Sequence, residues 1–272
     1  MRVTAIPKAI WFVATLAAAV LLATPSFAQG DRGAEIRVAH LSPDAPNVDV
    51  YVDGEPLSTV QDVAYGTVSS YLPLRAGAHD VKMYEAGSSS RPLLEAELDL
   101  RDGVAYTVVA VGLAGDDSLQ AQVYEDDNSL PAGDDAKLRV IHASPDVAAV
   151  DIGPENQDDL FTHLGFPNAT KYVKVPAGTY PLEGTLAGTN EEAFKVTATL
   201  APQTVYTAFG IGLADEGTFE VKLVKDAGTG GLQSDNTPPG TGGFSPAWIL
   251  FAALLIAAAT SSVAWRLVRD AR

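Results

Sequence analysis

Short segments in which apolar and polar residues alternate fill the chain between about residue 36 and residue 225. They are rich in β-branched residues, and turn formers such as Asp53 and Gly54 separate them. Alternation with a period of two predicts β-strands, and no segment of this region shows the longer period of an amphipathic helix. Seven such segments between residues 36 and 126 have the spacing of an antiparallel two-sheet sandwich.

The same segments occur twice. IRVAHLSPD at residues 36–44 matches LRVIHASPD at residues 138–146, an offset of 102 residues. Two later blocks match at offsets of 101 and 100, namely those that begin at Tyr71 and Tyr172 and those that begin at Tyr106 and Tyr206. Three matching blocks in one order indicate an internal duplication. We therefore expect an all-β protein of two tandem immunoglobulin-like antiparallel β-sandwich domains, followed by a C-terminal transmembrane helix.

Changes in composition set the predicted boundaries. The body is divided into a first sandwich over residues 35–127, a linker over 128–136, a second sandwich over 137–226 and a flexible stalk over 227–246. The linker and the stalk are polar and rich in Pro and Gly, without an apolar period, as is typical of connecting segments.

Both ends of the chain have the pattern of targeting segments. Residues 1–28 predict a signal peptide, because Arg2 and Lys8 precede an apolar run that ends in small residues at Ala28. Residues 247–265 carry no charge and make a helix of about 28 Å, close to the thickness of a bilayer core. The tail over 266–272 is basic, which predicts that it stays in the cytoplasm and that the body is exported as a single-pass cell-surface protein.

Residues 238–242 have the sequence PPGTG. Followed by an apolar span and a basic tail, this segment resembles a sortase sorting signal of the LPxTG pattern, with Pro239, Thr241 and Gly242 in the matching positions. The resemblance implies covalent attachment to the cell wall after Thr241. The alternative is that the helix is retained in the membrane.

Charge and cysteine content limit the partners. The chain has no cysteine, so its stability depends on apolar packing without disulfides. Without the terminal segments, 13 basic residues stand against 33 acidic ones, a net charge of about −20. Nucleic acid is excluded as a partner, because phosphate binding needs basic patches. The expected partners are the membrane, through the C-terminal helix, and a cell-wall polymer or surface glycan; the oligomeric state stays open.

The repeated His-x-Ser-Pro-Asp motif is the main candidate site. Alternation places His40 at the end of the apolar face that also carries Ile36 and Val38. In one interpretation the imidazole is a partly buried group, hydrogen-bonded to a loop carbonyl or a carboxylate, and Pro43 and Asp44 form an ordinary turn. In the other, the loops bind a ligand. The candidate binding residues are His40, Asp44, Asn47 and Asp49 in the first copy and His142, Asp146 and Asp151 in the second.

Two further hypotheses use the same loops. Asp44, Asp49 and Asp53 offer oxygen ligands for calcium, although the loop lacks the spacing of an EF-hand; no other cofactor is expected. Ser42 with His40 and a nearby aspartate would be the set for a surface hydrolase, but no glycine-framed nucleophile turn surrounds the serine. Tyr71 and Tyr172 are predicted to pack in the core or at its rim, with glycan stacking as the alternative.

Both copies resemble a known family, the first over residues 35–126 and the second more loosely over residues 137–225. The resemblance rests on RVAHLSPDAPNVDVYVDG, VAYGTVSSYLPLRAG and YTVVAVG, which are similar to the domain of unknown function 4397 (DUF 4397) family, a family common in exported bacterial and archaeal proteins and often found in tandem. The family has no agreed activity or active-site residues, so the resemblance implies a surface setting and an immunoglobulin-like sandwich only. The expected function is non-enzymatic: two modules displayed for adhesion, envelope structure or ligand binding. The alternatives are the surface hydrolase and a calcium-stabilised spacer.

Overall fold

The computed structural model describes residues 33–228. The predicted signal peptide, transmembrane helix, basic tail and sorting-like motif at Pro239, Thr241 and Gly242 lie outside the described residues, as does the stalk beyond residue 228. The described part consists of strands and connecting turns, which confirms the all-β prediction. Between residues 33 and 228 there is no helix of the length and apolarity needed to cross a membrane.

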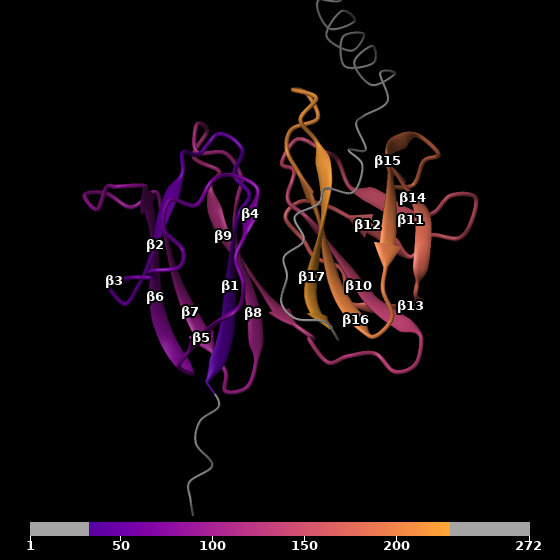
Figure 1. Cartoon of the computed structure of the whole chain (residues 1–272). Coiled ribbons are helices and arrows are strands. Elements are labelled where there is room, and N and C mark those ends of the chain that lie inside the picture. Colours follow the sequence, from indigo (N-terminus) through magenta and orange to yellow (C-terminus); the bar gives the residue numbers. More distant parts are fainter. Residues whose placement is uncertain (1–32, 229–272) are drawn as a thin grey trace, which may run out of the picture. The chain divides into compact units, whose positions relative to one another are not determined.

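The first repeat contains β1 to β9, arranged in two sheets (Figure 1). One sheet has the order β4-β1-β8-β9, with β5 also paired to β1, and the other has the order β3-β2-β6-β7. The strands are β1 (Ala34–His40), β2 (Val48–Val52), β3 (Glu55–Pro56), β4 (Thr67–Val68), β5 (Leu72–Leu74), β6 (Gly77–Glu85), β7 (Leu94–Leu100), β8 (Ala105–Val111) and β9 (Gln120–Asp126).

The second repeat contains β10 to β17 in the same arrangement. Its sheets have the orders β13-β10-β16-β17 and β12-β11-β14-β15. The strands are β10 (Asp135–His142), β11 (Val150–Pro154), β12 (Phe161–Leu164), β13 (Val173–Pro176), β14 (Gly178–Leu186), β15 (Glu192–Leu200), β16 (Thr204–Ile211) and β17 (Glu220–Gly228). Thus β10 begins inside the segment expected to be a linker, and β17 extends into the segment expected to be a stalk.

The sheets are not wholly antiparallel, so the prediction is wrong at one pairing in each repeat. β1 pairs with β8 in parallel, and β10 pairs with β16 in parallel. All other pairings of named strands are antiparallel within residues 33–228. Between β1 and β8 the chain passes through the second sheet, and such a crossover lets the returning strand run in the same direction. The alternation of side chains is the same in either direction, so it could not reveal this pairing.

A hydrophobic core fills each sandwich. In the first repeat Ile36 and Val38 pack in a core that also includes Val50 and Met83 of the facing sheet. The corresponding core of the second repeat includes Leu138, Ile152 and Phe194. These cores confirm the prediction that the apolar face of each opening strand faces inward.

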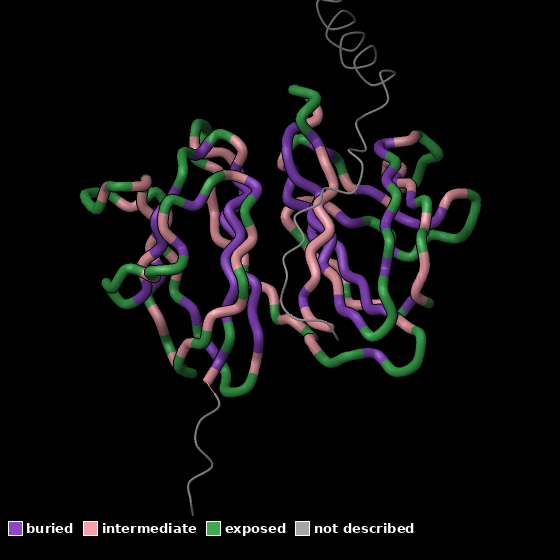
Figure 2. The backbone as a smooth tube through the Cα atoms, viewed as in Figure 1, coloured by how far each residue is buried: buried purple, intermediate pink, exposed green. Residues whose placement is uncertain are grey.

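The central strands of the sheets that contain β1 and β10 are buried on both faces along most of their length. A third core cluster joins the two repeats: Ala39, Leu41, Val109 and Val111 of the first, and Ile141, Ala143, Phe209 and Ile211 of the second. All residues of β8 are therefore buried, whereas in β6 only Val81 and Met83 are buried and the other residues are of intermediate exposure or exposed (Figure 2). The sheets that contain β1 and β10 are called the inner sheets. The sheets β3-β2-β6-β7 and β12-β11-β14-β15 are called the outer sheets.

Candidate functional site

The histidine of each repeated motif ends an inner-sheet strand and is buried. The Nε2 atom of His40 lies 3.0 Å from the carbonyl oxygen of Pro46, and that of His142 lies 3.3 Å from the carbonyl oxygen of Ala148. A carbonyl only accepts, so Nε2 carries the proton in both rings. Nδ1 of each ring is buried without a hydrogen-bond partner. Burial lowers the pKa of both histidines, only partly offset by the carbonyl bonds, which favours the neutral rings.

The serine and aspartate of the motif fix a neighbouring loop. Ser42 donates to Asp44 Oδ1 at 3.2 Å, and the amides of Ala114 and Gly115 each donate to the Asp44 carboxylate at 2.8 Å. Burial raises the pKa of Asp44, but the hydrogen bonds outweigh it and leave the pKa below its usual value. The second repeat has a similar arrangement, because Asp146 accepts from the amide of Asp215 at 2.9 Å. The Ser144 hydroxyl lies 3.1 Å from Asp146 Oδ1 and donates to the nearer Gly212 carbonyl at 2.7 Å.

The next predicted site residue, Asp49, also binds backbone amides. Its carboxylate accepts from the amide of Asp62 at 2.7 Å and from that of Gly87 at 2.8 Å. The Asn47 side chain donates to the side chain of Asp62 at 2.9 Å. Asp151, the counterpart of Asp49, accepts from the amides of His163 and Gly188 at 2.6 and 2.9 Å. These carboxylates therefore hold pairs of loops together.

Asp53 belongs to a different group of contacts. It accepts from His79 at 2.7 Å and from the amide of Asp80 at 3.0 Å. Asp44, Asp49 and Asp53 thus accept hydrogen bonds from different segments of the chain. In the part of the chain that the structure describes, no three His, Asp or Glu side chains form a group suited to a metal ion.

The first prediction concerns Asp49. Replacing it by alanine removes the acceptor of two backbone amides and should lower the free energy of unfolding by about 1–3 kcal/mol. Because the carboxylate is occupied by those amides, EDTA or added calcium should leave the melting temperature of the wild-type protein unchanged. Both effects are measured by thermal and urea unfolding, with Asp99→Ala at an exposed position of β7 as the matched control. A calcium-dependent rise in the melting temperature that Asp49→Ala abolishes would contradict this role.

The geometry around Ser42 does not resemble that of a hydrolase. Ser42 and His40 are both 0% exposed, so a substrate carbonyl cannot reach the hydroxyl. The hydroxyl donates to a carboxylate, and Nε2 of the imidazole is bound to a backbone carbonyl. A nucleophilic serine needs a hydrogen bond to its general base. In this site each of the two groups instead stabilises a turn.

A network of buried polar side chains connects the repeats, and sequence reasoning missed it. Arg37 of β1 donates from Nη1 to Asp226 Oδ1 of β17 at 2.7 Å. Its Nε donates to Thr107 at 2.8 Å, and its Nη2 donates to Thr207 at 3.1 Å. The side chains of Arg37 and Asp226 are 1% and 0% exposed. A charged pair between the repeats is therefore removed from water.

Arg139 of β10 forms the reciprocal set of contacts. Its Nη2 donates to the Oδ1 atom of Asp126 on β9 and to Thr107, the latter at 3.1 Å, and its Nε donates to Thr207 at 2.9 Å. Each arginine thus pairs with the aspartate of the other repeat, and each threonine accepts from both arginines. Reciprocal contacts of this kind are typical of a two-fold symmetric interface.

Tyr71 and Tyr172 complete this interface. The Tyr71 hydroxyl donates to Asp126 at 2.6 Å, and the Tyr172 hydroxyl donates to Asp226 at 3.0 Å. The guanidinium carbons of Arg37 and Arg139 lie 4.9 and 4.7 Å from the centres of the Tyr71 and Tyr172 rings. Burial raises the pKa of both phenols. One ring face and the hydroxyl of each tyrosine are thus occupied, which supports packing at the core rim over glycan stacking.

The two arginines left a signal in the sequence. Arg37 and Arg139 occupy the same position in the aligned opening strands, between apolar residues. A charged residue repeated inside a strand that is otherwise buried indicates a buried partner, because an unpaired buried charge is too costly. The partner of Arg37, Asp226, lies 189 residues away in the chain and had no local signal.

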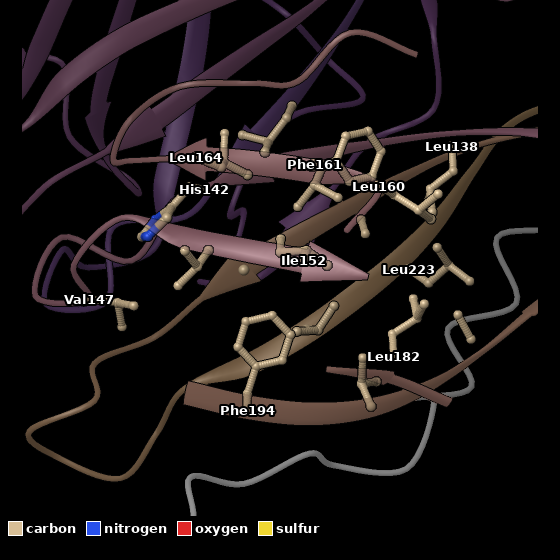
Figure 3. A pocket seen from close by; sticks show the side chains of 18 of the residues that line it. Leu138, His142, Val147, Ile152, Leu160, Phe161, Leu164, Leu182, Phe194 and Leu223 are labelled. Carbon is tan, nitrogen blue, oxygen red and sulfur yellow. The ribbon is translucent and has the colours of Figure 1, made fainter. Parts of the chain in front are cut away.

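A small cavity lies between the two sheets of the second repeat (Figure 3). Figure 3 shows His142 at one end of it and Leu223 toward the other, with Phe161 and Phe194 contributed by different strands. Its volume is about 40 Å³ and its lining is apolar apart from His142 and Thr197. Ligand pockets are typically several hundred Å³. The cavity is therefore a packing defect of the core.

Comparison with known proteins gives one family match. The model of the family described as Domain of unknown function (DUF4397) matches residues 34–153, which include every strand of the first repeat. No curated protein matches this chain.

Two solved structures show weak likeness to this chain. CBMbc (family CBM26) from Eubacterium rectale Amy13K, in complex with maltoheptaose, is 10% identical with a TM-score of 0.24, over 73% of this chain and 98% of that one. The Bacillus anthracis TIE protein is 13% identical with a TM-score of 0.21, over 66% of this chain and 34% of its own length. At these TM-scores neither likeness supports a conclusion about fold or ligand.

Proposed function

We propose that the chain is a non-enzymatic binding protein of the cell surface. The match of residues 34–153 to the model of the family described as Domain of unknown function (DUF4397) and the interface between the repeats support this proposal. The signal peptide and the C-terminal span predicted from the sequence would export the body and hold it at the membrane, or at the wall if the sorting-like motif is cleaved. The two sandwiches would serve adhesion, envelope structure or ligand capture.

The observation that carries this proposal is the buried network that contains Arg37, Asp226, Arg139 and Asp126. A flexible tandem array needs no such contacts, because its modules act independently. Here two charge pairs and an apolar cluster are buried between the repeats, so the repeats form one unit with a fixed set of outward faces. A rigid unit binds without losing the conformational freedom of a hinge, which favours recognition of an extended ligand.

The repeated motif supports the same proposal. Its histidine and serine are buried, its exposed aspartate is bound by the amides of a neighbouring loop, and the arrangement around Ser42 lacks the features of a nucleophile. These contacts therefore hold the loops in a fixed conformation. Ligand recognition would use the exposed side chains that these loops and the outer sheets present.

The test is a binding experiment with purified residues 29–235, which include every described residue. We expect saturable binding to one of three fractions of the host cell, namely wall, neutral polysaccharide or membrane, with the same affinity in calcium and in EDTA. A heat-denatured sample is the control for non-specific retention. Absence of binding to all three fractions, or turnover of a wall or polysaccharide component by the protein, would overturn the proposal.

A further inference from the structure

The outer sheet of the first repeat has a solvent face that carries two tyrosines. Tyr51 of β2 pairs with Lys82 of β6, and Asp49, two positions before Tyr51 on β2, pairs with Tyr84 of β6. Residues two apart on a strand share a face, so Tyr51, Lys82 and Tyr84 lie on the same side of the sheet. Val50 and Met83 point the other way, into the core. The two phenol rings are therefore on the outside of the sandwich.

These rings form a contact with each other and are partly exposed. Their centres lie 5.1 Å apart with an angle of 73° between the planes, an edge-to-face pair. Both tyrosines are half-buried. Within the described residues no hydrogen bond to either hydroxyl is found, whereas Tyr71 and Tyr172 use theirs inside the interface. The hydroxyls of Tyr51 and Tyr84 thus remain available to a ligand.

Polar groups surround the tyrosine pair. Lys82 lies 3.4 Å from Asp80 and 3.5 Å from Glu95, and these two carboxylates hold its ammonium group on the same face of the sheet. In the sheet register, Glu95 is opposite Lys82 and Glu97 is opposite Asp80. The face therefore combines apolar ring surface with carboxylate acceptors and one ammonium donor. Its excess of carboxylates disfavours an anionic polymer.

The second repeat shows the same face in a covered form. The counterpart of Tyr51 in the register is Gly153, and the counterpart of Tyr84 is Thr185. The loop over residues 155–160 crosses the sheet there, because a β-carbon built on Gly153 would lie 2.8 Å from Asp159 Cα and 3.0 Å from the carbonyl oxygen of Asp158. One repeat thus covers this face with its own backbone, while the other leaves it open and places two aromatic rings on it.

We propose that the outer face of the first repeat, defined by Tyr51, Lys82, Tyr84 and Glu95, is a binding site for a neutral oligosaccharide. A sugar ring has an apolar face of C–H groups, which stacks on an aromatic ring, and an edge of hydroxyl groups, which donate to carboxylates and accept from an ammonium group. This face has both aromatic rings and charged hydrogen-bonding groups, and its carboxylates disfavour anionic glycans. This inference rests on the proposed binding function and names its ligand class.

The test measures binding of linear hexasaccharides by calorimetry, with α-1,4-linked glucose, β-1,4-linked glucose, β-1,3-linked glucose and β-1,4-linked N-acetylglucosamine as probes. We expect at least one to bind residues 29–235 with one site per chain, because only the first repeat has the open face. Tyr51→Ala and Tyr84→Ala should each raise Kd about tenfold or more, as for aromatic anchors at other interfaces. Thr185→Ala, the matched change in the second repeat, should leave Kd unchanged.

The outcomes separate this inference from the proposed function. If none of the four hexasaccharides binds, or if binding survives both tyrosine changes in variants with the wild-type melting temperature, the oligosaccharide site is overturned. The proposed function stands in that case as long as the protein binds a cell fraction. Two sites per chain would also overturn the inference, because they would indicate features common to both repeats. Loss of binding in both tyrosine variants with an unchanged melting temperature is the supporting result.

Discussion

Replacing Asp226 by alanine is expected to lower the free energy of unfolding by about 3–5 kcal/mol, the usual cost of removing one partner from a buried ion pair. Arg37, 1% exposed, would lose its carboxylate and keep its charge in a place that water does not reach. Thr207 and Tyr172 would lose an acceptor at the same time. Urea unfolding followed by fluorescence measures the change, since the midpoint shifts while the slope stays constant if only stability is altered.

The control is Glu125→Ala. Glu125 pairs with Arg101, and the side chains of these two residues are 60% and 61% exposed, so this exposed pair contributes at most about 1 kcal/mol. A second variant, Arg37→Met combined with Asp226→Leu, should recover part of the lost stability, because apolar replacements of similar volume remove the unpaired charge. Equal stability of Asp226→Ala and the wild type would show that the two repeats do not bury this pair in solution.

The reciprocal contacts of the repeats explain why one substitution has so large an effect. Thr107 and Thr207 each accept hydrogen bonds from both arginines, so neither ion pair is independent of the other. The apolar cluster that includes Leu41 and Ile211 continues the same interface. The duplication thus produced a chain that contains both halves of a nearly symmetric interface, which requires no second molecule.

The sequence predicts local structure well where one face of a strand decides it. The alternation around Ile36, Val38 and His40 predicted an inward-facing set, and all three are buried. The alternation gives no information about what packs against the opposite face of the strand. Arg37 lies on that face, and its partners come from strands up to 189 residues away. Since packing between repeats leaves no local pattern, the inner sheets and their parallel pairings became known only from the structure.

For the candidate site, the structure contains contacts of the kind that the turn interpretation of the sequence expected. Pro43 and Asp44 were expected to form an ordinary turn and His40 to contact a loop carbonyl, and the Pro46 carbonyl is that contact. The identity of the amides that bind Asp44 could not be foreseen, because Ala114 and Gly115 belong to a loop about seventy residues away. Binding of a ligand by these loops stays a prediction.

The pair formed by Tyr51 and Tyr84, by contrast, could not be predicted from the sequence. Each tyrosine occupies a polar position in an alternating strand, which is a visible signal, but the two are 33 positions apart in the sequence. Only the register of β2 with β6 brings them together, and only the loop over Gly153 shows that the second repeat lacks this face. Sites that depend on strand pairing are therefore the part of function that a single sequence reveals least.

Lowering the pH from 7 to 5 is expected to destabilise the protein through His40 and His142. Burial lowers the pKa of both rings below the value of 6.5 that they have when unfolded. Between the folded and the unfolded pKa values the unfolded chain binds more protons, so stability falls as the pH decreases below about 6.5. Each histidine contributes a slope of up to about 1.4 kcal/mol per pH unit. Urea midpoints at half-unit intervals of pH measure the slope.

His79 supplies a control of opposite sign. Burial lowers its pKa, but hydrogen bonds to Asp53 and to the Arg75 carbonyl outweigh this effect and raise it. Its stabilising contribution is therefore fully present below pH 6.5 and is lost as the pH rises through the raised pKa. His40→Gln and His142→Gln should each flatten the acid slope, whereas His79→Gln should steepen it. The contrary result is a wild-type stability that stays constant from pH 7 to 5, with no difference among the three variants. It would mean that neither motif histidine is buried as a neutral ring. The stabilising role of the repeated loops would then have to be abandoned.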